Sequence, residues 1–275
     1  MVRDVGLEAA GFYSVAWALS GLYVELIFQA MGADFGPRLA SVATDNTLIN
    51  RLANEQAQVN LLLAGPGIIA KVTFAPLVIP LLYSNKFAEA VEILRWICLG
   101  MALRVITWPI GFIVVAKNRQ LIQFGETFAL NLVNVGLAWV CVGHFGLNGA
   151  GIAFFGSNLF RGLLVYSTAR ALSGFRWSAA NRKTGAVFLC SIAFVFCSSY
   201  LLPPLWAAVL GGIATALSGL YSLHTLLNLL STDRIPQRVR QWLTWLRLDR
   251  RGFASLLSAP HDQIVAGNTG PQERS

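Results

Sequence analysis

Long apolar runs separated by short polar stretches dominate the chain. We predict seven membrane-spanning α-helices, at about residues 9–30, 58–83, 96–116, 121–143, 149–169, 184–202 and 205–229. A helix needs about 20 apolar residues to cross the hydrocarbon core of a bilayer, which is roughly 30 Å thick. The pattern therefore predicts an all-α fold, a polytopic integral membrane helix bundle that occupies residues 1–230.

Two segments outside the apolar runs have patterns of their own. Residues 31–57 are polar and mildly amphipathic, which favours a helix lying along the membrane surface. Residues 231–257 place tryptophans and aliphatic residues at helical spacing among arginines. This favours a basic amphipathic segment in the cytoplasmic headgroup layer, with a soluble helix packed on the protein as the alternative. Residues 258–275 are polar and glycine-rich, which is typical of a disordered tail.

Composition supports a membrane protein. Only 12% of the 275 residues are charged and 55% are hydrophobic, whereas a soluble domain has roughly 25% charged residues. The formal net charge of +8 does not indicate nucleic-acid binding, because the charges lie between and after the apolar runs. The four cysteines lie inside apolar runs without metal or redox spacing, so we interpret them as small buried hydrophobic residues.

Lysine and arginine are distributed unevenly between the predicted loops. The loops after the fourth and sixth spans contain none, whereas those after the third and fifth contain Lys117, Arg119, Arg170, Arg176, Arg182 and Lys183. The positive-inside rule then places these basic loops and the C-terminus in the cytoplasm, and the N-terminus on the periplasmic side. Because no signal peptide precedes the first span, we expect a fragment, or one half, of a larger transporter.

Three cations lie deep inside predicted spans. Lys71, Arg104 and Arg161 are roughly 20, 18 and 13 Å from the cytoplasmic ends of their helices. The spanning acids, Glu25 and Glu126, lie only about 8–9 Å deep. A charged side chain that faces lipid costs about 2.5–3.5 kcal/mol or more, so these side chains are expected to face the interior of the bundle.

Two interpretations of these charges stay open, structural ion pairs or a water-filled cationic cavity. The cavity is favoured by Asn134, which shares a broad helix face with Glu126, and by Asn158, one turn before Arg161. Four prolines remove backbone hydrogen bonds and are predicted to kink two of the helices. They are Pro66, Pro76, Pro80 and Pro109.

Motifs for enzymatic chemistry are missing from the sequence. It has no P-loop to bind ATP, no H-E-x-x-H, no C-x-x-C and no G-x-S-x-G. Short loops also lack aspartates of the kind that membrane glycosyltransferases use to hold a metal. We therefore expect a protein that is not an enzyme and that uses no catalytic residue, metal or cofactor.

Several stretches together resemble the polysaccharide flippases of the MOP (multidrug/oligosaccharidyl-lipid/polysaccharide) superfamily, especially the bacterial O-antigen translocases. They are "GLEAAGFYSVAWALSGLYVELIFQAMGADFGPRL" at 6–39, "NEQ" at 54–56, "FAPLVIPLLYSNKF" at 74–87, "RVITWPIGFIVVAKN" at 104–118 and "GLNGAGIAFF" at 146–155. Their order and spacing resemble the C-terminal half of such a transporter.

The resemblance implies one lobe of a two-bundle transporter in the bacterial inner membrane. It implies a substrate, an oligosaccharide linked through pyrophosphate to undecaprenol, which moves from the cytoplasmic to the periplasmic leaflet. Lys71, Arg104 and Arg161 are then expected to compensate the pyrophosphate charge. Membrane lipid and a separate N-terminal half or oligomer partner are the other expected partners.

Other functions stay open at this point. A MATE-like drug or cation antiporter would favour an acidic cavity, and a flippase for a peptidoglycan precursor has the same composition. A glycan polymerase or transferase would need large periplasmic loops with catalytic clusters, and the predicted loops are short. A truncated membrane scaffold without transport activity is the remaining alternative.

Overall fold

A computed structural model of the chain describes residues 2–229, with side chains from residue 10 onward except Asn85. It divides into two compact units, Met1–Leu223 and His224–Ser275, and every contact described below lies within the first. The predicted amphipathic segment at 231–257 and tail at 258–275 lie outside the described residues. In residues 2–229 all regular secondary structure is helical, which confirms the all-α prediction.

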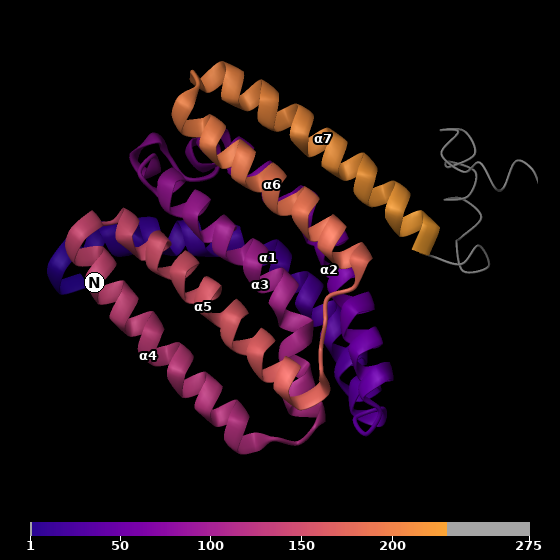
Figure 1. Cartoon of the computed structure of the whole chain (residues 1–275). Helices are drawn as coiled ribbons and strands as arrows, with labels where there is room; N and C mark the ends of the chain where they lie inside the picture. Colours follow the sequence, from indigo (N-terminus) through magenta and orange to yellow (C-terminus); the bar gives the residue numbers. More distant parts are fainter. Residues whose placement is uncertain (1, 230–275) are drawn as a thin grey trace, which may run out of the picture. The chain divides into compact units, whose positions relative to one another are not determined.

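In residues 2–229, seven α-helices and one short 3-10 helix follow one another (Figure 1). They are α1 (Val2–Ser41), α2 (Asn46–Leu82), η1 (Asn85–Phe87), α3 (Ala90–Ala116), α4 (Gln120–Phe145), α5 (Asn148–Ser173), α6 (Ala179–Leu201) and α7 (Pro204–Leu229). Five of the predicted spans correspond closely to α3 through α7. The first two predicted spans lie inside much longer helices.

Residues 31–57 are mostly helical, as predicted, but they form no separate segment: residues 31–41 continue α1, residues 46–57 begin α2, and only residues 42–45 lie between the two helices. The Asp45 carboxylate caps α2, accepting hydrogen bonds from the backbone N–H groups of Thr47 at 2.8 Å and Leu48 at 3.1 Å. Ile49 and Ala53 are buried one helical turn apart, so a narrow apolar stripe packs on the bundle while polar residues face outward. At 1.5 Å per residue α1 is about 60 Å long, about twice the thickness of the hydrocarbon core.

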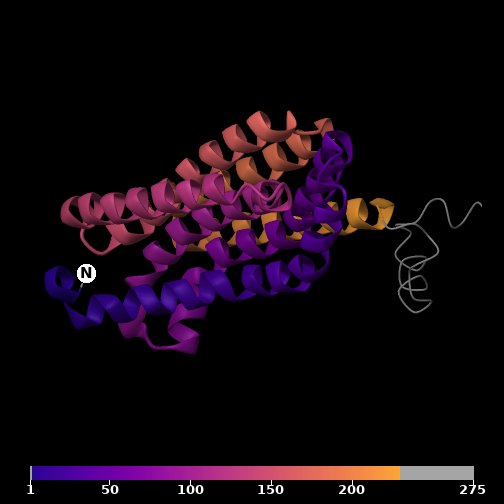
Figure 2. The same cartoon turned by 90° about the horizontal axis from the view of Figure 1, so that it is seen from below.

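Helix α3 occupies the centre of the bundle and packs against α1, α2 and α5. Helix α4 packs on α5, and α6 packs on α2, so α4 and α6 lie on opposite sides of α3 (Figure 1). The view from below shows α1 running beside α3 (Figure 2). A helix that contacts several neighbours can carry polar side chains without exposing them to lipid.

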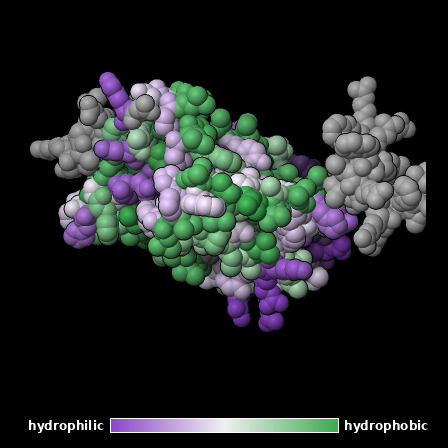
Figure 3. Space-filling model, turned by 90° about the horizontal axis from the view of Figure 1, so that it is seen from above, coloured by the Kyte–Doolittle hydropathy of each residue, from purple (hydrophilic) through white to green (hydrophobic). Residues whose placement is uncertain are grey.

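Six helices, all except α5, are long and apolar enough to cross a membrane. Helix α5 is less apolar because it carries Asn158 and Arg161 near its middle, and it lies between α3 and α4. Green apolar side chains cover the middle of the face seen in Figure 3, with purple hydrophilic side chains toward its left and lower right margins. This distribution is typical of a protein that spans a bilayer.

Candidate functional site

A cavity of about 250 Å³ lies between α1, α3, α4 and α5. It is lined by Trp17, Glu25, Arg104, Leu130, Asn131, Asn134, Phe154, Ser157, Asn158 and Arg161. Arg104 is about 18 Å from the C-terminal end of α3, and Asn134 and Asn158 lie near the middles of α4 and α5. The cavity is therefore near half the depth of the bundle, where a polar lining is costly to maintain.

Arg104 forms an ion pair across the cavity wall. One guanidinium nitrogen of Arg104 lies 3.3 Å from a carboxylate oxygen of Glu25 on α1. The guanidinium also lies 5.7 Å from the ring centroid of Phe28, a contact that favours a cation. Gly32 allows this closeness of α1 and α3, because a Cβ there would lie only 3.2 Å from the ring of Trp108. Glu25 thus neutralises one of the two arginines.

Arg161 has no ion pair or hydrogen bond with any residue that the structure describes. Its charge is repelled by Arg104 and attracted by Glu126, which does not line the cavity. One carboxylate oxygen of Glu126 is buried without a hydrogen-bond partner. The cavity wall therefore carries an excess of positive charge, centred on Arg161.

Amide and hydroxyl groups complete the polar wall. The Ser157 hydroxyl of α5 donates a hydrogen bond to the Asn134 Oδ1 of α4 at 3.3 Å. Asn158 is 4% exposed, and its Nδ2 donates to the carbonyl oxygen of Phe154 in its own helix at 2.9 Å. Asn131 lies one turn before Asn134 and is exposed. Such groups can donate to and accept from the hydroxyls of a sugar.

Close packing of α5 holds this wall in place. A Cβ at Gly151 would lie 2.8 Å from the Cβ of Trp96 in α3, and one at Gly149 would overlap the Cys141 carbonyl oxygen in α4. A Cβ at Gly100 of α3 would lie 2.6 Å from the Phe154 ring. Small residues of this kind let membrane helices approach closely, so α5 fits between its neighbours.

The structure does not bring Lys71 to this cavity. Its ammonium donates a hydrogen bond to the Ser20 carbonyl oxygen of α1 at 2.9 Å and lies 5.5 Å from the Tyr23 ring centroid. The Tyr23 hydroxyl in turn donates to the Leu63 carbonyl oxygen of α2 at 2.7 Å. Lys71 therefore joins α1 to α2 and is not part of the cavity wall.

Five of the seven predicted pathway residues share the cavity. The structure contains one ion pair among the predicted charges, and the water-filled cavity stays a prediction. Glu25, Arg104, Asn134, Asn158 and Arg161 line it, while Lys71 and Glu126 do not. Arg104 belongs to an ion pair, whereas Arg161 has none within the described part of the chain.

Sequence reasoning missed Trp17 and Asn131 as lining residues. The signal for Asn131 was its position three residues before Asn134 on one helix face. The four prolines lie inside helices that continue through them, and the kinks expected there remain a prediction.

The fold and the cavity define a polytopic helical membrane protein with a polar, cationic cavity between α1, α3, α4 and α5. Residues 3–92 match the model of a family described as "Polysaccharide biosynthesis protein". The match covers α1, α2 and η1, about a third of the chain, and supports a role in polysaccharide synthesis or export. No curated protein sequence matches the chain.

Proposed function

We propose that the chain moves an oligosaccharide, linked through pyrophosphate to a polyprenyl lipid such as undecaprenol, across the bacterial inner membrane. The observation that carries the proposal is the cavity at mid-bundle depth whose wall includes Arg161, a cation without an ion-pair partner among the described residues. A pyrophosphate is an anion that must leave water to cross the membrane, and a guanidinium in a low-dielectric site is a strong partner for it. The family match at residues 3–92 supports a role in polysaccharide synthesis or export, with which this cargo is consistent.

The cavity wall offers complementary chemistry for both parts of this headgroup. Arg161 and Arg104 can hold phosphate oxygens, while the Asn131, Asn134 and Ser157 side chains can exchange hydrogen bonds with sugar hydroxyls. Trp17 provides an aromatic surface on the same wall, against which the apolar face of a sugar can pack. Helix α4 borders the cavity, and all its residues are partly or fully exposed. The lipid chain of the cargo can therefore stay in the bilayer beside α4 while the headgroup occupies the cavity.

The proposal includes an orientation. The α1–α2, α3–α4 and α5–α6 connections lie at one end of the bundle, where hydrogen bonds link them. Among them, Lys117 Nζ lies 2.7 Å from Asn46 Oδ1, and Asn50 Nδ2 lies 2.8 Å from the Ser173 carbonyl oxygen. Arg119, Arg176 and Lys183 share that end. The positive-inside rule assigns this end to the cytoplasm, so in the proposed function cargo enters from there. We propose a transporter and not an enzyme.

A reconstitution experiment tests the function. The full chain is inserted into lipid vesicles that contain a fluorescent oligosaccharide linked to polyprenyl pyrophosphate, and a membrane-impermeant reagent quenches the outer leaflet. Transport predicts that quenching proceeds beyond the outer half of the fluorescence. In the variant Ser157→Leu, which places an apolar side chain in the cavity, quenching is expected to stop near half.

Two controls make the result decisive. Thr168→Leu makes the same kind of change on α5, outside the cavity, and is expected to behave like the natural sequence. Equal rates for Ser157→Leu and Thr168→Leu, or quenching that stops at half with the natural sequence, would contradict the proposal.

A further inference from the structure

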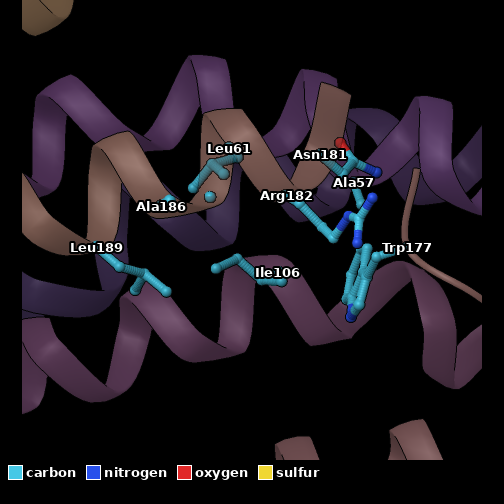
Figure 4. Close-up of a pocket in the computed structure, with 9 residues that line it drawn as sticks. Ala57, Leu61, Ile106, Trp177, Asn181, Arg182, Ala186 and Leu189 are labelled. Carbon is cyan, nitrogen blue, oxygen red and sulfur yellow. The ribbon is translucent and has the colours of Figure 1, made fainter. Parts of the chain in front are cut away.

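A second cavity, of about 210 Å³, lies between α2, α3 and α6 at the basic end of the bundle (Figure 4). Leu61 of α2, Ile106 of α3 and Leu189 of α6 form an apolar wall. Arg182 and Trp177 line the other end of the same space, as Figure 4 shows. The cavity is thus amphipathic, with an apolar interior and a cationic, aromatic end.

The polar end contains groups whose bonding capacity is unused within the described residues. Arg182 is exposed and has no side-chain hydrogen bond or ion pair there. Asn181 is 6% exposed, and its Nδ2 donates to the Asn54 carbonyl oxygen at 2.7 Å, but its Oδ1 has no hydrogen-bond partner among those residues. A buried acceptor without a partner is rare, because its desolvation is not compensated. The site is therefore incomplete as the described part of the chain forms it.

Both polar residues lie in the first turn of α6, whose axis adds to the positive potential. Helix α6 begins at Ala179, and the hydroxyl of Ser178 caps it by accepting a hydrogen bond from the Asn181 backbone N–H at 3.1 Å. A helix N-terminus favours anions, and a neighbouring arginine strengthens that preference. The helix that is long and apolar enough to span a membrane also begins at Ala179, which is consistent with a place for this turn at the bilayer surface.

We propose that this cavity binds an anionic phospholipid. Arg182 and the N-terminus of α6 hold the phosphate, and one acyl chain lies along Leu61, Ile106 and Leu189. Trp177 takes the position at the headgroup boundary that tryptophan prefers in membrane proteins. Basic pockets between spanning helices on the cytoplasmic side are suited to such lipids.

The apolar wall distinguishes a lipid from a soluble phosphate. A free phosphate ion would leave the Leu61, Ile106 and Leu189 surfaces without a partner. The cavity is smaller than the roughly 300–1,000 Å³ of pockets that enclose a whole ligand, so the rest of the lipid lies against the apolar outer surface. This inference concerns a different cavity from the proposed transport site and does not depend on transport.

Lipid retention and thermal stability test the proposal with the purified full chain in zwitterionic detergent. Phosphatidylglycerol is the probe, with native mass spectrometry to count bound lipid and melting temperature as a second measurement. Arg182→Gln is expected to lower phosphatidylglycerol affinity about tenfold, because it removes a charge-assisted hydrogen bond. Ala186→Leu fills the cavity and is expected to abolish retention while leaving the melting temperature without lipid unchanged.

Lys183→Gln is the matched control, since Lys183 is the adjacent exposed base and does not line the cavity. It is expected to retain lipid as the natural sequence does. Equal losses for Arg182→Gln and Lys183→Gln would show attraction to surface charge alone and overturn the site. The proposal is also overturned if phosphatidylcholine or inorganic phosphate stabilises the chain as well as phosphatidylglycerol does, or if only a prenyl pyrophosphate stabilises it.

Discussion

At the scale of single residues, Arg104 and Arg161 face one cavity in different electrostatic surroundings. Glu25 lies 3.3 Å from Arg104 and balances its charge, whereas Arg161 has only the more distant attraction of Glu126. Arg161 is exposed and lines the cavity, so the proposed function assigns the attraction of an incoming anion to this cation. Arg161 is the available charge, and the Arg104–Glu25 pair fixes α1 against α3.

A double-mutant cycle tests that division. Glu25→Gln and Arg104→Gln are each expected to lower the free energy of unfolding, and the double variant is expected to lose less than their sum. The coupling energy should be about 1 kcal/mol, because both side chains are partly exposed. Unfolding of the purified variants in mixed micelles measures it. Additive losses would mean that the two side chains do not interact in the folded protein.

Lys71 is expected to affect stability and not transport. Lys71→Met removes the hydrogen bond to the Ser20 carbonyl oxygen but also the cost of burying an ammonium, so the free energy of unfolding should change by no more than about 1.5 kcal/mol. The transport rate in vesicles should be unchanged, because Lys71 does not line the cavity. If the transport rate of Lys71→Met falls as far as that of Ser157→Leu, Lys71 takes part in transport and this prediction is wrong.

At the scale of elements, α5 is the helix on which the site depends. It carries Ser157, Asn158 and Arg161 and is held between α3 and α4 by glycines at its contacts. Any side chain at Gly151 would meet the backbone carbonyl of Ile93 at 3.1 Å. Backbone cannot rotate away as a long side chain can, so the two helices would have to separate.

Two glycine substitutions separate this packing effect from helix propensity. Gly151→Ala is expected to lower the free energy of unfolding by about 1–3 kcal/mol through overpacking. Gly136→Ala, in α4, would place its methyl group in open space, with no neighbouring atom within 4 Å. It is expected to raise the free energy of unfolding slightly, since alanine favours helix more than glycine does. Equal stability of the two variants would mean that α5 does not pack tightly on α3.

Hydrophobic runs predicted the number and order of the helices in residues 2–229, but not where α1 ends or where α2 begins. Polar residues between 31 and 57 suggested a surface segment, yet Asp45 caps α2 and Ile49 and Ala53 face the core, so helix continues through most of it. Depth along a helix also follows from sequence, which is how Arg104 and Arg161 were found. The direction of Lys71 around its helix depends on how α1 and α2 pack, and sequence spacing does not contain that information.

At the scale of the whole molecule, the basic end of the bundle predicts its orientation in the membrane. Reporter fusions after Asn118 and Gly174 are expected to fold in the cytoplasm, and fusions after Gly146 and Leu202 in the periplasm, because the first pair lies at the lysine- and arginine-rich end. Fluorescent protein and alkaline phosphatase reporters distinguish the two sides. The opposite pattern would reverse the proposed direction of entry.

The central claim is that cargo passes through the cavity between α1, α3, α4 and α5, and thiol labelling tests it most directly. The four cysteines of the chain are first replaced by alanine. Asn134→Cys then places a thiol in the cavity. Leu132→Cys places one on the apolar surface of the same helix, at a residue that is 65% exposed. A charged, water-soluble thiol reagent is expected to label Asn134→Cys and not Leu132→Cys. Oligosaccharide linked to polyprenyl pyrophosphate should then slow the labelling of Asn134→Cys. Labelling that the substrate leaves unchanged, or no labelling at this position, would contradict the claim.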